Sequence, residues 1–272
     1  MSQDPRTASS SATAAPASSF DFAAIVEGLN RFLKLRSIPI GMKRFKTKAE
    51  MEAIPRIRRP SAKHALDQFV GQARMLGWTL GITMDDLVGK QCGAPVGLAA
   101  RDAEWLSGKL MHNVWFGTQE DSAAHQAAMD CSGYGEYEAL AVSPLTAGRL
   151  NPPDICLIFG TPGQMILFIN GLQWTGYKKL DFTVVGESAC ADSWGRALKT
   201  GEPSLSIPCY AERRFGGVAD DELLMAIPPS YLPKVLEGLA QLDKRGLRYP
   251  ISPWSVQADP SASLAVSYGG KF

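Results

Sequence analysis

The chain has 272 residues, of which 45% are hydrophobic and 20% are charged, so it can bury a sizeable core and is not disordered as a whole. Its 28 basic and 27 acidic residues give a net charge of +1. This balance argues against a dedicated nucleic-acid-binding protein, which normally carries a basic excess. No apolar run reaches the roughly 18 residues that a membrane-spanning helix needs. We therefore expect a globular protein that binds neither nucleic acid nor a membrane.

The two ends of the chain differ in composition from the middle. Residues 1–19 are mainly Ser, Ala, Thr and Pro and are expected to form a disordered tail without a secretory signal. We expect a single domain over 20–249, with two subdomains meeting near 135–150 as an alternative division. The Pro/Ser-rich tail at 250–272 either wraps the surface or packs on a second copy of the chain in a homo-oligomer.

In chain order, the first half alternates helical and extended patterns. Apolar residues at helical spacing predict a helix that begins after Asp21, and a second helix is expected over 62–76. Between them, 37–45 is typical of a strand, which Pro39 restricts to a sheet edge or a strand start. A further strand is expected over 78–82, whereas 101–134 is expected to be irregular.

The second half is clearer, because its apolar runs are short and well separated. Strands and helices mix without a regular βαβ alternation, which predicts an α+β fold: a mixed sheet of short strands with flanking helices. The expected strands are 137–142, 155–159, 182–185, 204–207 and 223–227, with a helical turn at 144–147 and helices at 162–174 and 229–242.

The five cysteines are the main candidates for chemistry. Cys92, Cys190 and Cys209 each lie where a loop or strand is expected to lead into a helix, a setting that favours the thiolate. Cys156 lies within an apolar strand and is expected to be a core residue, and Cys131 lies in the irregular region. The odd number and wide spacing predict thiols in a reducing cytoplasm, and the absence of Cys-x-x-Cys excludes a zinc ribbon. The alternative is that all five are simply buried thiols.

The other candidate residues would surround such a site. Among the histidines, His64 is expected at the surface of a helix, and His125 lies among small residues without an aromatic neighbour. His112 is the preferred acid–base residue, with His125 or Glu212 as substitutes. The remaining candidates are substrate-binding residues: Trp115 and Phe116 as pocket walls, and Arg213 and Arg214 as partners of a substrate carboxylate.

Several segments together resemble the bacterial and archaeal family of domain of unknown function 169. They include 90–94, 152–154, 163–165, 187–192 and 201–210, and the resemblance covers roughly 38–242. It implies that the family's cysteines fall at Cys92, Cys190 and Cys209. After Cys209 the chain departs from the family pattern, because Ala211 and Glu212 stand where glycine and aspartate are usual. The family implies no particular reaction.

Three converging thiolates would bind a metal centre and leave one coordination position open. In a [4Fe–4S] cluster the open iron can act as a Lewis acid on a substrate oxygen, which is the logic of hydro-lyases. We therefore predict an iron–sulfur-dependent lyase, that is, a hydratase or a dehydratase. Its expected substrate is a small organic molecule, and the aromatic pocket walls favour an aromatic or apolar one. A zinc ion with three cysteines and a water is the alternative cofactor.

Two further functions remain open from the sequence. The first is a metal-free protein that binds a small molecule or regulates, with structural cysteines. The second is a metal-free enzyme with Cys209 as nucleophile, activated by Arg213 and Arg214.

Overall fold

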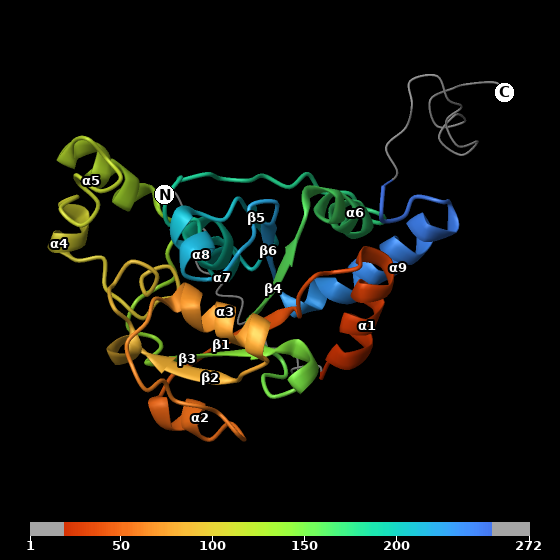
Figure 1. The fold of residues 1–272 in the computed structure, drawn as a ribbon, viewed down its shortest axis with the longest axis horizontal. Coiled ribbons are helices and arrows are strands. Elements are labelled where there is room, and N and C mark those ends of the chain that lie inside the picture. Colours follow the sequence, from red (N-terminus) through yellow and green to blue (C-terminus); the bar gives the residue numbers. More distant parts are fainter. Residues whose placement is uncertain (1–18, 252–272) are drawn as a thin grey trace, which may run out of the picture.

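A single six-stranded sheet, in the order β2-β3-β1-β4-β6-β5, forms the centre of the molecule (Figure 1). The computed structural model describes residues 19–251, so nearly all of both expected tails lies outside the described residues. Every neighbouring pair of strands is antiparallel, where a mixed sheet was expected. The strands are β1 (Ile40–Phe45), β2 (Leu80–Thr83), β3 (Ala139–Pro144), β4 (Ile155–Gly160), β5 (Ser204–Ser206) and β6 (Leu223–Ile227).

Helices cover both faces of the sheet. The longer ones are α1 (Phe22–Leu33), α3 (Leu66–Leu76), α5 (Gln119–Ala128), α6 (Pro162–Leu172) and α9 (Leu232–Lys244). Four short ones are α2 (Lys48–Glu52), α4 (Ala103–Leu106), α7 (Arg196–Thr200) and α8 (Tyr210–Arg214). Single turns complete the fold: η1 (Met84–Asp86), η2 (Leu145–Ala147) and η4 (Pro229–Tyr231) are 3₁₀, and η3 (Ala191–Gly195) is a π-helical turn.

Alternation along the strands separates two apolar cores. In β4, Cys156 and Ile158 point to one face, where they pack with α1, α6 and α9. Leu157 and Phe159 point to the other face, where they pack with α3, β1 and the segment around Trp194. Because successive strand residues point to opposite faces, one run of buried residues serves both cores.

A close backbone contact brings the chain after β5 onto helix α3. A Cβ atom on Gly71 of α3 would lie 2.6 Å from the carbonyl oxygen of Gly216, so only glycine allows this approach. The contact places α8 and the residues that follow it beside the first turns of α3. Residues about 140 positions apart in sequence thereby share one end of this helix.

The α+β fold is confirmed, and three local predictions were wrong. Segment 101–134 contains the helices α4 and α5, each capped by a side chain, from Asp102 and Thr118. Segment 182–185 is not a strand, because it has no partner strand and hydrogen-bonds to Asp192 instead. His64 precedes helix α3 rather than lying within a helix. Pro39 was expected at a sheet edge or at the start of a strand. It directly precedes the central strand β1, so the second possibility is confirmed.

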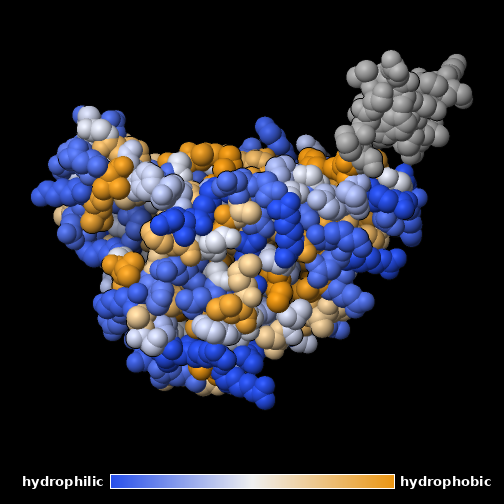
Figure 2. Space-filling model, in the orientation of Figure 1, coloured by the Kyte–Doolittle hydropathy of each residue, from blue (hydrophilic) through white to orange (hydrophobic). Residues whose placement is uncertain are grey.

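No helix between residues 19 and 251 is long and apolar enough to cross a membrane. The face shown in Figure 2 carries separate apolar groups among charged ones. Single exposed apolar residues of this kind are normal on a folded protein.

Candidate functional site

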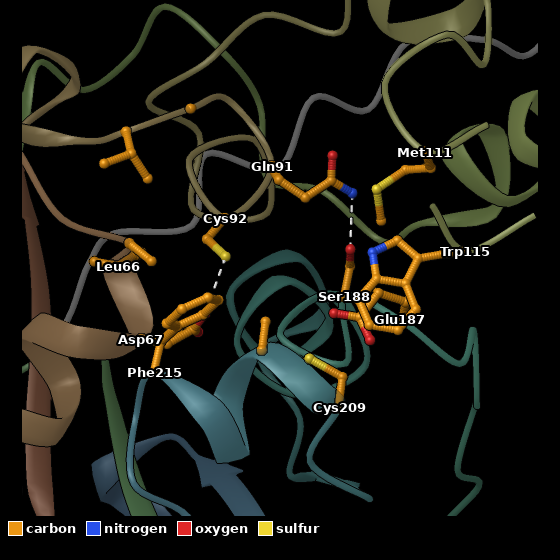
Figure 3. Close-up of a pocket in the computed structure, with 14 residues that line it drawn as sticks. Leu66, Asp67, Gln91, Cys92, Met111, Trp115, Glu187, Ser188, Cys209 and Phe215 are labelled. Atoms are coloured by element: carbon orange, nitrogen blue, oxygen red, sulfur yellow. Dashed lines mark hydrogen bonds between the residues drawn. The ribbon is translucent and has the colours of Figure 1, made fainter. Parts of the chain in front are cut away.

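A pocket of about 210 Å³ opens beside the first turn of α3 (Figure 3). Its walls come from five segments: 65–67, 88–92, 111–115, 187–188 and 209–215. Gln91 Nε2 donates a hydrogen bond of 2.7 Å to Ser188 Oγ and so ties two of these segments together. Ser188 has a φ of +64°, which is sparsely populated for a residue other than glycine. Such strain is often found at functional sites.

The structure brings Cys92, Cys190 and Cys209 to this place from three distant segments. Cys92 and Cys209 line the pocket, and Cys190 lies buried behind it, where its thiol donates a hydrogen bond of 3.6 Å to the carbonyl oxygen of Ser188. The Cys92 thiol also donates to Asp67 Oδ2 at 3.4 Å. Cys156 packs on the opposite face of the sheet, as expected, and Cys131 packs beside Trp105 in a separate small core. Cys92 and Cys209 therefore line one pocket with Cys190 close behind it, whereas Cys131 and Cys156 lie elsewhere.

Buried carboxyl groups accompany the thiols. Glu212 Oε2 accepts a hydrogen bond of 2.9 Å from the backbone N–H of Cys209, whereas Glu212 Oε1 and Asp67 Oδ1 are buried without a partner. Burial, with repulsion from Glu187, raises the pKa of Asp67 to about 6. Burial, with repulsion from Asp67, raises the pKa of Glu212 to about 8. Both shifts reflect carboxyl groups that lack a positive partner.

The expectation that the local fold favours thiolates was wrong. The hydrogen bond with Cys190 lowers the pKa of Cys92, but burial and the Asp67 carboxyl together raise it to about 11. Burial and Glu212 raise the pKa of Cys209, and the hydrogen bond with Cys92 and burial raise that of Cys190. Carboxyl groups that only the tertiary structure brings close outweigh the local effect of a helix start.

The predicted acid–base and wall residues separate in the structure. Trp115 lines the pocket, together with Met111, whereas His112 and Phe116 do not. The Phe116 ring packs on His125 with ring centroids 4.8 Å apart, so His125, which has no aromatic neighbour in the sequence, has one in the fold. His125 Nε2 lies 2.7 Å from the carbonyl oxygen of Glu187. His125 therefore supports a pocket segment from behind.

The predicted arginines do not reach the pocket. The Arg213 guanidinium hydrogen-bonds with the carbonyl oxygen of Ala219, and Arg214 is exposed. Neither lines the pocket, although Ala211 and Phe215, on either side of them in the sequence, do.

Sequence reasoning missed Asp67, Glu187 and Phe215, which line the pocket. Asp67 lies on an ordinary helical pattern, and nothing nearby in sequence marks it. Glu187 and Ser188 belong to a segment that carried the family resemblance, so that segment was a usable signal. Across residues 19–251, no group of three or more His, Cys, Asp and Glu side chains is arranged to hold a metal ion.

The fold and the site define a class: an α+β protein with an open antiparallel sheet and one pocket of thiols and carboxyl groups against α3. The model of the DUF169 family, described as uncharacterised ArCR, matches residues 28–238, and the chain belongs to this family. It is also 25% identical to the uncharacterized protein MJ0308 of Methanocaldococcus jannaschii over 177 residues, which cover 63% of this chain and 74% of that protein. No solved structure matches the chain.

Proposed function

We propose that Cys92, Cys190 and Cys209 bind an iron–sulfur cluster, and that the protein is a lyase that adds water to, or removes it from, a small organic molecule in the adjacent pocket. The proposal depends on one observation: thiol and carboxyl groups lie close together at the pocket beside α3, without a positively charged partner. Two thiols line the pocket and a third lies behind it, next to two buried carboxyl groups. The pocket lining within the described residues contains no Lys, Arg or His.

Electrostatics support a positively charged occupant. The raised pKa values of Asp67, Glu212 and Cys92 come from burial and from like charges near one another. A metal centre reverses these shifts, because it favours the deprotonated thiol and carboxyl groups. The two unpartnered oxygens, Asp67 Oδ1 and Glu212 Oε1, are buried acceptors that a positive or hydrogen-bond-donating group would satisfy.

The residues around the pocket supply the rest of the chemistry. With three cysteine ligands, a cluster leaves one iron open to polarise a substrate oxygen. Asp67 lines both the pocket and an inner cavity of about 10 Å³, which Glu212 and Trp194 also line. That cavity has room for one water molecule. In this proposal Asp67 takes a proton from the substrate as the substrate's hydroxyl group leaves, and Glu212 holds that proton.

The proposal is tested by anaerobic purification, with iron and sulfide analysis and a visible absorption spectrum. We expect about four iron atoms per chain in the parent protein and a brown colour. Cys92→Ala, Cys190→Ala and Cys209→Ala should each lose the iron. Cys156→Ala is the matched control, because it removes a buried thiol from the opposite face and should retain the iron. A colourless parent protein without metal would rule the proposal out.

Catalysis needs a separate readout once the iron is established. Dehydration of a panel of small hydroxy compounds can be followed by the absorbance of the double bond that forms. Asp67→Asn should lower turnover by about 100-fold or more while the iron content stays constant, the size expected for the loss of an acid–base group. His112→Ala should change turnover little, because His112 does not line the pocket.

A metal-free small-molecule-binding protein is the second candidate. Two hydrogen bonds favour it: the Cys190 thiol donates to the carbonyl oxygen of Ser188, and the Cys92 thiol donates to Asp67 Oδ2. Protonated thiols are then satisfied without a metal. This candidate predicts that Cys190→Ala lowers stability and leaves ligand affinity intact. The proposed cluster predicts the loss of iron in the same variant.

A further inference from the structure

The mouth of the pocket is built from an aromatic ring and a carboxylate. Trp115 and Glu187 both line the pocket, and Figure 3 shows them on the same side of it, with Phe215 on the other side. Trp115 is 42% exposed and Phe215 is 52% exposed, so two large apolar side chains face solvent at this opening. Exposed apolar groups that line a cavity are typical of a ligand site.

Glu187 is held in position by its neighbours. Its Oε2 accepts a hydrogen bond of 3.3 Å from the backbone N–H of Tyr210, and its carbonyl oxygen lies 2.7 Å from His125 Nε2. The Tyr210 ring in turn packs on Trp115, with ring centroids 5.4 Å apart. The ring and the carboxylate therefore form one supported unit rather than two independent surface side chains.

The charge of the lining excludes a carboxylate ligand. Its ionisable groups in the described part of the chain are Asp67, Glu187, Cys92 and Cys209, all of them neutral or negative. Arg213, the arginine nearest to Cys209 in the sequence, donates a hydrogen bond to the backbone carbonyl oxygen of Ala219 instead. An anionic ligand would meet repulsion from both carboxyl groups and find no basic side chain in the lining.

We infer that the pocket binds a small apolar molecule that carries a protonated nitrogen, placed between the Trp115 ring and the Glu187 carboxylate. A carboxylate attracts an ammonium group, and an aromatic ring attracts the same cation through its electron-rich face. The apolar body of the ligand lies against Met111 and Phe215. The volume of about 210 Å³ limits this body to a single ring or a short chain.

This inference rests on the proposed function only in taking the pocket as the substrate site, and it adds the charge of the substrate. It does not need the cluster. Glu187 and Trp115 lie outside the three-cysteine set, and the contacts that support them involve none of the cysteines. The charge preference of the pocket can therefore be measured whatever the metal content.

The test compares three ring compounds of nearly equal size: benzylamine, which is protonated at pH 7, benzyl alcohol and benzoate. Binding to the full chain is measured by titration calorimetry, and the metal content of the same sample is determined. We expect benzylammonium to bind at least about tenfold more tightly than benzyl alcohol, and benzoate not to bind.

Variants then assign the preference to the mouth. Glu187→Gln should bring the affinity for benzylammonium to within about twofold of that for benzyl alcohol, and Trp115→Leu should weaken benzylammonium binding. Glu120→Gln, on the exposed first turn of α5, is the matched control and should keep the full preference. Equal binding of the amine and the alcohol, binding of benzoate, failure of every probe to bind, or an unchanged preference in Glu187→Gln would each overturn the inference. Metal-free protein that prefers benzylammonium would overturn the proposed cluster alone.

Discussion

The two ends of helix α3 bury charge in opposite ways. In its last turn, Arg74 is 4% exposed and forms an ion pair of 2.5 Å with Glu222, which is 2% exposed. Arg74 also lies over the Phe159 ring. In its first turn, Asp67 is equally buried, but its neighbours are thiols and Glu212, and within residues 19–251 no basic side chain lines the pocket there.

The difference between the two ends of α3 indicates which buried charge serves the fold and which serves a binding site. A buried charge is costly unless it is paired, and the fold does supply the partner at one end of the helix. At the other end, one oxygen of Asp67 and one oxygen of Glu212, on the adjacent helix α8, have no partner among residues 19–251. Since the fold does not complete this end, we infer that a bound group does.

Removing the cation at the paired end should have the largest effect. Arg74→Met leaves Glu222 buried without its partner, which should lower the free energy of unfolding by about 3–5 kcal/mol. Urea unfolding monitored by circular dichroism measures this change. Arg36→Met is the control, because Arg36 pairs with Asp221 at the surface, where both side chains are about half exposed, and its stability should match the parent protein. Equal losses in the two variants would contradict the contrast.

At the unpaired end, pH should decide stability in the metal-free protein. The folded-state pKa of Glu212 is about 8, above its ordinary value of 4.5, so the folded state holds its proton more tightly than the unfolded state. The associated stability is present below about pH 4.5 and is lost as the pH rises through about 8. Asp67 adds a loss in the same direction as the pH rises through about 6.

Unfolding by urea at pH 5.5, 7 and 8.5 measures this dependence. Stability should fall across the series in the metal-free parent protein and fall less in Glu212→Gln, which cannot ionise. Bound metal should weaken the dependence further, because it favours the charged carboxyl groups. A parent protein that gains stability relative to Glu212→Gln as the pH rises would show that Glu212 has a positive partner after all.

The same small substitution should distinguish the two faces of the sheet. Cys156→Ser places a hydroxyl group in an apolar core and should cost about 1–3 kcal/mol. Cys190→Ser should cost less in the metal-free protein, because its hydroxyl group can bond to the carbonyl oxygen of Ser188, which the thiol already contacts at 3.6 Å. Thermal unfolding of both variants gives the comparison. A larger loss in Cys190→Ser would mean that the thiol is needed for packing rather than for a site.

Sequence patterns alone predicted most of the fold and singled out three of the five cysteines as candidates for a site. Period-two and helical patterns are local, so they indicated all six strands of the sheet as well as helices α1, α3, α6 and α9 close to their true positions. The one additional strand that they indicated, 182–185, does not form. An apolar run around Cys156 sufficed to assign that residue to the core. Three cysteines lie at segment ends and match the family resemblance: Cys92, Cys190 and Cys209. These are the cysteines that lie in or directly behind the pocket.

The carboxyl groups that surround those cysteines could not be predicted from the sequence, because they come close only in the tertiary structure. Asp67 lies 25 residues from Cys92 and about 140 from Cys209, and it reaches both because Gly71 lets the chain at Gly216 pack directly on α3. Burial and the nearby carboxyl groups raise the pKa of the thiols that were expected to be thiolates, and Glu187, rather than an arginine, lines the pocket. Charge and burial act through space, so neighbours far apart in sequence determine them, and no local pattern records those neighbours.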